Sequence, residues 1–95
     1  MSSRTMDYQK EFKKVALSPP HCILGKKGIT DDFLTHVTNL LKRYKIIKIK
    51  ALKSIATKSN IKELANQTSQ LTQSYLVDVR GKIFILSLEQ IRKLN

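Results

Sequence analysis

The sequence predicts a single α/β (α+β) domain with the element order α-β-α-β-α-β-β. Three observations support this prediction. Apolar residues recur at helical spacing in three stretches, they alternate with lysines in a fourth, and two short apolar runs surround a glycine near the end. The 95 residues are enough for one domain with one modest core. We expect this domain to span residues 1–95, with its core at about 8–87 and a tail at 88–95.

The first half of the chain predicts two helices with a short strand between them. Residues 8–16 carry an apolar stripe, and Pro19-Pro20 ends this helix because proline cannot continue the hydrogen-bonded ladder. Residues 21–24 then form a short extended run. Thr30 can cap the next helix, whose apolar stripe continues as far as Tyr44.

A strand follows the second helix, because residues 46–52 alternate with a period of two. This period places Lys48 and Lys50 on one face of the strand. The other face carries Ile47, Ile49 and Ala51.

The last third of the chain predicts a helix and a hairpin. Asn60 and Glu63 have the spacing of a capping box that would begin the helix. A turn at Arg80-Gly81 then joins two strands, and right-handed crossovers would make the strands of each strand–helix–strand unit parallel. The run 83–86 is apolar on both faces, so we place it inside the sheet. Ser87 and Gln90 form a second capping pair for a short helix in the tail.

The charge of the chain is strongly unbalanced. Eighteen Lys and Arg face seven Asp and Glu, which gives a net charge of +11 and a pI near 10.1. On so small a domain this balance indicates a polyanionic partner, either a nucleic acid or an acidic membrane surface. No stretch approaches the roughly 20 apolar residues of a membrane span, and the first residues carry no secretory signal. The single cysteine, Cys22, suits a reducing compartment, so we expect a cytoplasmic protein without a membrane partner.

Nucleotide binding and catalysis are both disfavoured by the sequence. The segment Gly25-Lys26-Lys27-Gly28 lacks the spacing of a Walker loop and the third glycine of a dinucleotide fingerprint. Asp31 and Asp32 are explained as helix-start residues, and no serine or cysteine shows a sequence link to a histidine base. Cys22, His21 and His36 are too few and too poorly spaced for a zinc site. We therefore predict no catalytic residues, no metal, no cofactor and no small-molecule substrate.

The basic residues are concentrated in the middle of the chain. Residues 42–62 contain no acid, and a clustered positive face of this kind fits the phosphates of a nucleic-acid backbone. If about six phosphates were neutralised, binding to single strands would weaken with log salt at a slope near −4. The sequence has no pair of aromatics on a strand, so we expect recognition by shape and phosphate more than by base stacking. The basic residues of this segment are Lys42, Arg43, Lys45, Lys48, Lys50, Lys53, Lys58 and Lys62.

Two interpretations of the glycine loop remain open on spacing alone. Glycines permit a close approach, so phosphates could reach the backbone N–H groups while Lys26 and Lys27 supply charge near a helix N-terminus. The alternative is a plain glycine turn between strand and helix, with solvated lysines. A Gly-x-x-Gly pattern is weak by itself, and the two are about equally compatible with it.

The order of these motifs resembles the CRM domain family (chloroplast RNA splicing and ribosome maturation), including its small stand-alone YhbY-like members. The matching residues are Ile23 to Thr30, then Ile46 to Lys50 after an amphipathic helix, and Gly81 before the last strand. The resemblance implies a two-layer α/β sandwich with a mixed four-stranded sheet, similar to the C-terminal domain of translation initiation factor three. It also implies RNA binding through the Gly-x-x-Gly loop without enzymatic activity, and stand-alone members are associated with ribosomal subunits or their precursors.

The sequence thus predicts a non-catalytic protein that binds ribosomal RNA, as an assembly factor or a ribosome component with neighbouring ribosomal proteins as further partners. A small basic DNA-binding protein of the chromatin type is the alternative, and a small RNA-processing enzyme is the third hypothesis. The candidate RNA-binding residues are Gly25, Lys26, Lys27, Gly28, Thr30, Lys42, Arg43, Lys45, Lys48 and Lys50.

Overall fold

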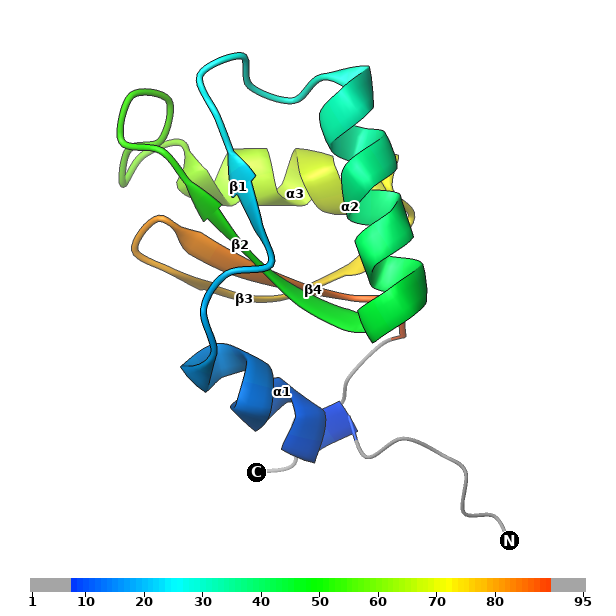
Figure 1. Cartoon of the computed structure of the whole chain (residues 1–95). Coiled ribbons are helices and arrows are strands. Elements are labelled where there is room, and N and C mark those ends of the chain that lie inside the picture. The colour runs from blue at the N-terminus through cyan, green and yellow to red at the C-terminus, as the bar shows by residue number, and fades with distance from the viewer. Residues whose placement is uncertain (1–7, 90–95) are drawn as a thin grey trace, which may run out of the picture.

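The computed structural model describes residues 8–89, and within them the helices and strands follow the predicted order (Figure 1). Apolar periodicity therefore located the elements correctly. Their bounds are α1 (Tyr8–Leu17), β1 (Cys22–Leu24), α2 (Asp31–Tyr44), β2 (Ile46–Ala51), α3 (Ile61–Leu71), β3 (Tyr75–Arg80) and β4 (Ile83–Ser87).

The four strands form one mixed sheet in the order β1-β2-β4-β3. β1 pairs with β2 in parallel, and β4 pairs antiparallel with both β2 and β3. Because β4 opposes both neighbours, β2 and β3 run in the same direction, as predicted for the strands of one strand–helix–strand unit. β4 lies inside the sheet, which confirms the prediction made from its unbroken apolar run.

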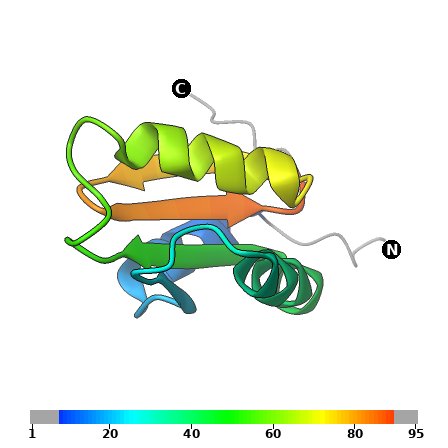
Figure 2. The same ribbon diagram turned by 90° about the horizontal axis from the view of Figure 1, so that it is seen from above.

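The main core lies between the sheet and the pair α2 and α3. α2 packs against β2 and α3 against β3 (Figure 2). β2 contributes alternate residues to this core, as its period of two predicted. The buried members include Leu24, Val37, Leu41, Ile47, Ile49, Ala65, Phe84 and Leu86.

The opposite face of the sheet carries a smaller core under α1. Val15 of α1 packs there with Ile46 of β2 and Ile85 of β4, and Phe12 borders them. The helices thus occupy both faces, with α1 on one and α2 and α3 on the other (Figure 1). The predicted two-layer arrangement describes the main core. On the opposite face of the sheet, α1 adds a partial third layer that leaves part of that face uncovered.

The capping box predicted at the start of α3 is wrong, although the helix begins where it was expected. Asn60 makes no side-chain capping bond. Its Oδ1 accepts from the backbone N–H of Thr57 at 2.7 Å, and its Nδ2 donates to the carbonyl of Ile55 at 2.9 Å. The amide is therefore used by the loop before α3, while the N–H of Ile61 reaches the carbonyl of Thr57 at 3.0 Å.

The predicted pair Ser87 and Gln90 falls at the limit of the described residues. The Oγ of Ser87 accepts from the backbone N–H of Glu89 at 3.2 Å. Gln90 and the tail helix it would begin lie outside the described residues. In the part of the chain from 8 to 89, no helix has the length and apolar character needed to cross a membrane.

Candidate functional site

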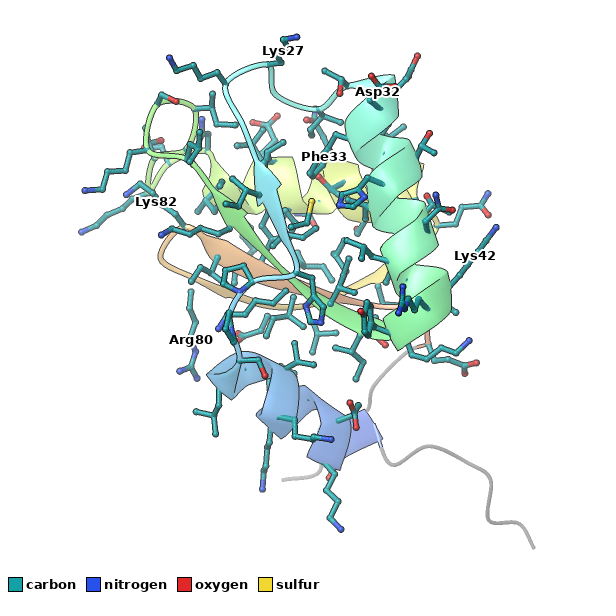
Figure 3. All side chains as sticks on the ribbon, viewed as in Figure 1. Lys27, Asp32, Phe33, Lys42, Arg80 and Lys82 are labelled. Carbon is teal, nitrogen blue, oxygen red and sulfur yellow. The ribbon has the colours of Figure 1, made fainter. Side chains whose placement is uncertain are left out.

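The glycine loop is a tight turn at the end of β1. The backbone N–H of Gly28 donates to the carbonyl of Gly25 at 2.9 Å, so Lys26 and Lys27 occupy the two central positions and are exposed. Figure 3 shows Lys27 at the outer end of the molecule. The turn therefore presents two adjacent positive charges at the tip of an edge strand.

The two glycines contribute differently to this turn. Gly28 has a φ of +75°, which disfavours a side chain. Gly25 has no such φ, and a Cβ built on it would meet nothing within 4 Å. Of these two glycines, the backbone conformation thus favours glycine only at Gly28. At Gly25 the missing side chain leaves the backbone open beside the two lysines.

Thr30 caps α2 as predicted. Its Oγ1 accepts from the backbone N–H of Phe33 at 3.1 Å, and its own backbone is extended, with φ −106° and ψ 167°. Asp31 and Asp32 follow in the first turn and are exposed. Their negative charges complement the helix dipole and oppose an anion that approaches along the helix axis. The positive character of this region therefore comes mainly from the lysines of the turn.

An open groove runs from the turn along β1 towards α2, with a volume of about 490 Å³. Ile23 on its edge is 56% exposed, which is unusual for a strand isoleucine. The Cys22 thiol points to the core side, and burial raises its pKa. The groove is lined by Cys22, Ile23, Gly25, Lys26, Lys27, Gly28, Thr30, Asp32, Phe33 and His36.

The strand pairing brings further cations to the same end of the sheet. Lys50 is exposed and lies in register with Ile23 of β1 and Ile83 of β4. The backbone N–H of Ala51 donates to the carbonyl of Lys82 at 2.8 Å, so the β3–β4 turn with Arg80 and Lys82 adjoins this end. Figure 3 shows Arg80 and Lys82 on one flank of the molecule.

Sequence reasoning missed Arg80 and Lys82 as members of this cationic end. The signal was present, because both residues flank the predicted turn glycine, Gly81. Placing them beside Lys50 required the strand order, in which β4 lies next to β2. The backbone N–H of Leu52 also donates to the carbonyl of Leu24 at 3.1 Å, which fixes the segment after β2 to the base of the glycine turn. We call Lys26, Lys27, Lys50, Lys53, Arg80 and Lys82 the loop-end cluster.

Lys48 has a different environment from Lys50, although the two share a face of β2. The Nζ of Lys48 donates to the carbonyls of Ala16 at 2.9 Å and Ser18 at 2.8 Å. A cation in this position neutralises the negative C-terminal end of α1 and satisfies two carbonyls that the helix leaves free. The geometry thus gives Lys48 a structural role, the attachment of α1 to the sheet.

His21 holds the same junction together from the other side. The ring Nδ1 of His21 accepts from the backbone N–H of Lys48 at 3.1 Å. The backbone N–H of His21 donates to the carbonyl of Lys48 at 2.8 Å. Burial, and secondarily the charge of Lys48, lower the pKa of His21. The ring also contacts Tyr44, with centroids 5.0 Å apart. The neutral imidazole therefore belongs to the structural framework of β1 and β2.

Lys42, Arg43 and Lys45 lie at the other end of α2 from the glycine turn. α2 has 14 residues, so it separates its two ends by roughly 20 Å. Arg43 lies over the ring of Tyr44, 5.4 Å from its centroid, and Lys45 ends the helix with its N–H on the carbonyl of Leu41. The predicted set is thus divided into the loop-end cluster and a helix-end cluster of Lys42, Arg43 and Lys45.

The geometry defines a class of protein: a small α+β domain whose mixed four-stranded sheet presents a glycine-bracketed basic turn at one end. A family model for the CRS1 / YhbY (CRM) domain matches residues 5–86, and the chain belongs to this family. This finding confirms the resemblance drawn from the motifs.

A solved structure supports the same fold. The chain is similar to the solution structure of SAV1595 from Staphylococcus aureus, a hypothetical protein for which RNA binding has been suggested. The two share 23% sequence identity and a TM-score of 0.71, with 90% of this chain and 88% of the other covered. The comparison with curated proteins finds no match.

Proposed function

We propose that the protein binds RNA through the loop-end cluster and has no catalytic role. The observation that carries the proposal is the exposed pair Lys26 and Lys27 at the apex of a tight turn, beside the open backbone of Gly25. In the described part of the chain, neither lysine forms an ion pair with an acid, so both charges are available to phosphates. Membership of the CRM family and the suggested RNA binding of the similar staphylococcal protein support the same partner.

The RNA that we propose is ribosomal RNA, within a ribosomal subunit or its precursor. A folded RNA offers phosphates at many angles, and this suits cations held on a turn and on strand ends rather than along one helix. The helix-end cluster then serves as a second contact for an RNA long enough to reach both ends of α2. We do not count Lys48 among the phosphate contacts, because two of the three N–H donors of its ammonium already have carbonyl partners.

The experiment compares two double variants that each remove two positive charges. Lys26→Ala with Lys27→Ala removes the turn lysines, and Lys42→Ala with Arg43→Ala removes two from the helix end. Loss of two phosphate contacts lowers the slope of log affinity against log salt by about 1.4 on unpaired RNA. We expect that change for the turn variant and a smaller one for the control. An unchanged affinity and slope for the turn variant would remove the turn from the mechanism.

Two further measurements test the partner. In competition, a structured ribosomal RNA fragment should displace a labelled RNA better than duplex DNA of the same length does. Equal competition by the DNA would favour the chromatin-type alternative. Sedimentation of a lysate at low and high salt then tests the ribosome: the protein should run with one subunit at low salt, and its absence from ribosomes at both salts would contradict the ribosomal assignment.

A further inference from the structure

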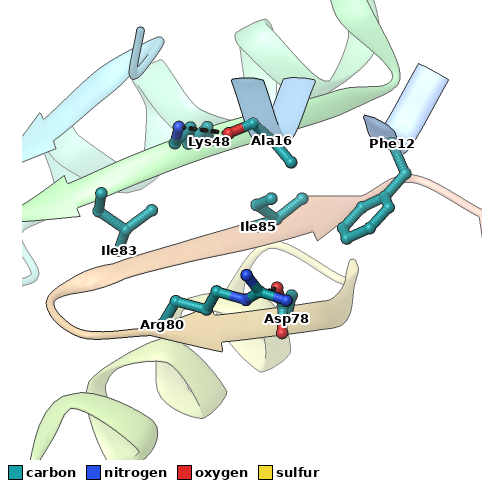
Figure 4. A pocket seen from close by; sticks show the side chains of 7 residues that line it. All are labelled: Phe12, Ala16, Lys48, Asp78, Arg80, Ile83 and Ile85. Atoms are coloured by element: carbon teal, nitrogen blue, oxygen red, sulfur yellow. Dashed lines mark hydrogen bonds and ion pairs between the residues drawn. The ribbon is translucent and has the colours of Figure 1, made fainter. Parts of the chain in front are cut away.

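The part of the sheet that α1 leaves uncovered forms a second cavity, away from the glycine turn. It has a volume of about 210 Å³ and lies between α1 and the strands β2, β4 and β3 (Figure 4). Its lining is mainly apolar. The lining residues are Phe12, Ala16, Lys48, Asp78, Arg80, Ile83 and Ile85.

The strand register explains why this cavity combines apolar and charged groups. Arg80 pairs with Ile83 and Asp78 pairs with Ile85, so each isoleucine of β4 has a charged neighbour on β3. On the other side Lys48 pairs with Ile85. The result is a floor of two isoleucines between a lysine and an acid–arginine pair, with α1 as one wall.

Arg80 lines the β3 side of the cavity and forms an ion pair with Asp78. Its Nε lies 3.3 Å from the Oδ2 of Asp78, whose side chain is 22% exposed, whereas the side chain of Arg80 is 86% exposed. The partly buried carboxylate thus holds the inner edge of the guanidinium and leaves its terminal nitrogens in solvent. A guanidinium held in this way offers a flat surface on which a nucleobase stacks, and a charge for the phosphate of the same nucleotide.

We propose that this cavity binds the base of one unpaired nucleotide of the RNA, a proposal that rests on the function proposed above. The two isoleucines would contact one face of the base and the guanidinium of Arg80 the other. Two polar groups remain for the base edge: Lys48 uses two of its three N–H donors on carbonyls, and Asp78 has a second carboxylate oxygen. The charge of the rim favours an anionic strand over a neutral partner, because Lys48, Arg80 and nearby Lys50 outnumber Asp78.

The test uses methyl and amide NMR of the full chain with two probes. One probe is a short unpaired oligoribonucleotide, and the other is the same strand annealed to its complement, whose bases are stacked and paired. With the unpaired strand, the methyl signals of Ile83 and Ile85 should shift and show contacts to base protons. With the duplex, the amides of Gly25 and Gly28 should shift, and the methyl signals of Ile83 and Ile85 should show no contacts to base protons.

Two variants make the test specific. Ala16→Leu fills the cavity without a change of charge, and Leu17→Met is its matched control, because Leu17 is 90% exposed and does not line the cavity. One stacked base contributes about tenfold or more to affinity for unpaired strands. We expect that loss for Ala16→Leu, with unchanged affinity for the duplex. Arg80→Lys keeps the positive charge but removes the planar guanidinium, so it should lower the affinity for the unpaired strand only.

The outcomes separate this inference from the proposed function. If the glycine amides respond to the unpaired strand while Ile83 and Ile85 stay unchanged, base binding is overturned and RNA binding by the turn stands. If all these signals stay unchanged with both probes and no RNA binds, both proposals fail. Equal weakening of strand and duplex by Arg80→Lys would reduce Arg80 to a phosphate contact and would also overturn the base site.

Discussion

Replacing Lys48 tests whether this residue attaches α1 to the sheet. Lys48→Met keeps most of the aliphatic stem but removes the ammonium that donates to the carbonyls of Ala16 and Ser18. A hydrogen bond from a charged donor contributes about 1.5–3 kcal/mol when buried, and a cation at a helix C-terminus about 0.3–1 kcal/mol. Because Lys48 is only partly buried and the two bonds share one ammonium, we take about 2 kcal/mol for the whole interaction.

The assay is urea unfolding followed by circular dichroism, with Lys50→Met as the matched control. Lys50 lies on the same face of the same strand but is exposed, so its replacement should change the free energy of unfolding by less than about 0.5 kcal/mol. For a domain of this size, a loss of 2 kcal/mol lowers the melting temperature by about 10 °C. Equal stability of the two variants would refute the structural role of Lys48.

Two more predictions concern the junctions around β1 and α3. Because the pKa of His21 is lowered in the folded state, the unfolded chain binds more protons just below pH 6.5, the ordinary value for histidine. The contribution of His21 to the free energy of unfolding should therefore be complete above about pH 6.5 and decrease as the pH drops below it, as measured by urea midpoints. His21→Gln should flatten this dependence, while His36→Gln, at an exposed position, should leave it in place. At the start of α3, Asn60→Asp should destabilise by about 1 kcal/mol in the same assay, because the carboxylate cannot donate to the carbonyl that Nδ2 reaches. A capping role would instead make aspartate as good as asparagine there.

The order of the elements could be predicted because each has a clear local signal. The apolar stripe of residues 31–44, the alternation of 46–51 and the two prolines after α1 depend only on neighbouring residues. The interior position of β4 was also predictable, because a strand covered on both faces needs apolar residues on both.

The environment of individual lysines could not be predicted in the same way. Alternation places Lys48 and Lys50 on one face of β2, but it cannot show that α1 covers one of them and leaves the other in solvent. That difference arises from a contact between residues about 30 positions apart in the sequence. Likewise, Lys42 and Lys50 are close in sequence, yet β2 runs back along the sheet and carries Lys50 to the other end.

The charges around the glycine turn also favour one direction of approach for the proposed phosphate contact. A helix N-terminus attracts anions, and a phosphate on the axis of α2 would meet its free N–H groups. Asp31 and Asp32 occupy that position and are exposed, so they repel a second anion there. On the side of β1, Gly25 leaves the backbone open and the two lysines add attraction. If RNA binds at the turn as proposed, the acids at the helix and the cations of the turn would direct its backbone to the edge of the sheet, on the side that leads towards Lys50 and the β3–β4 turn.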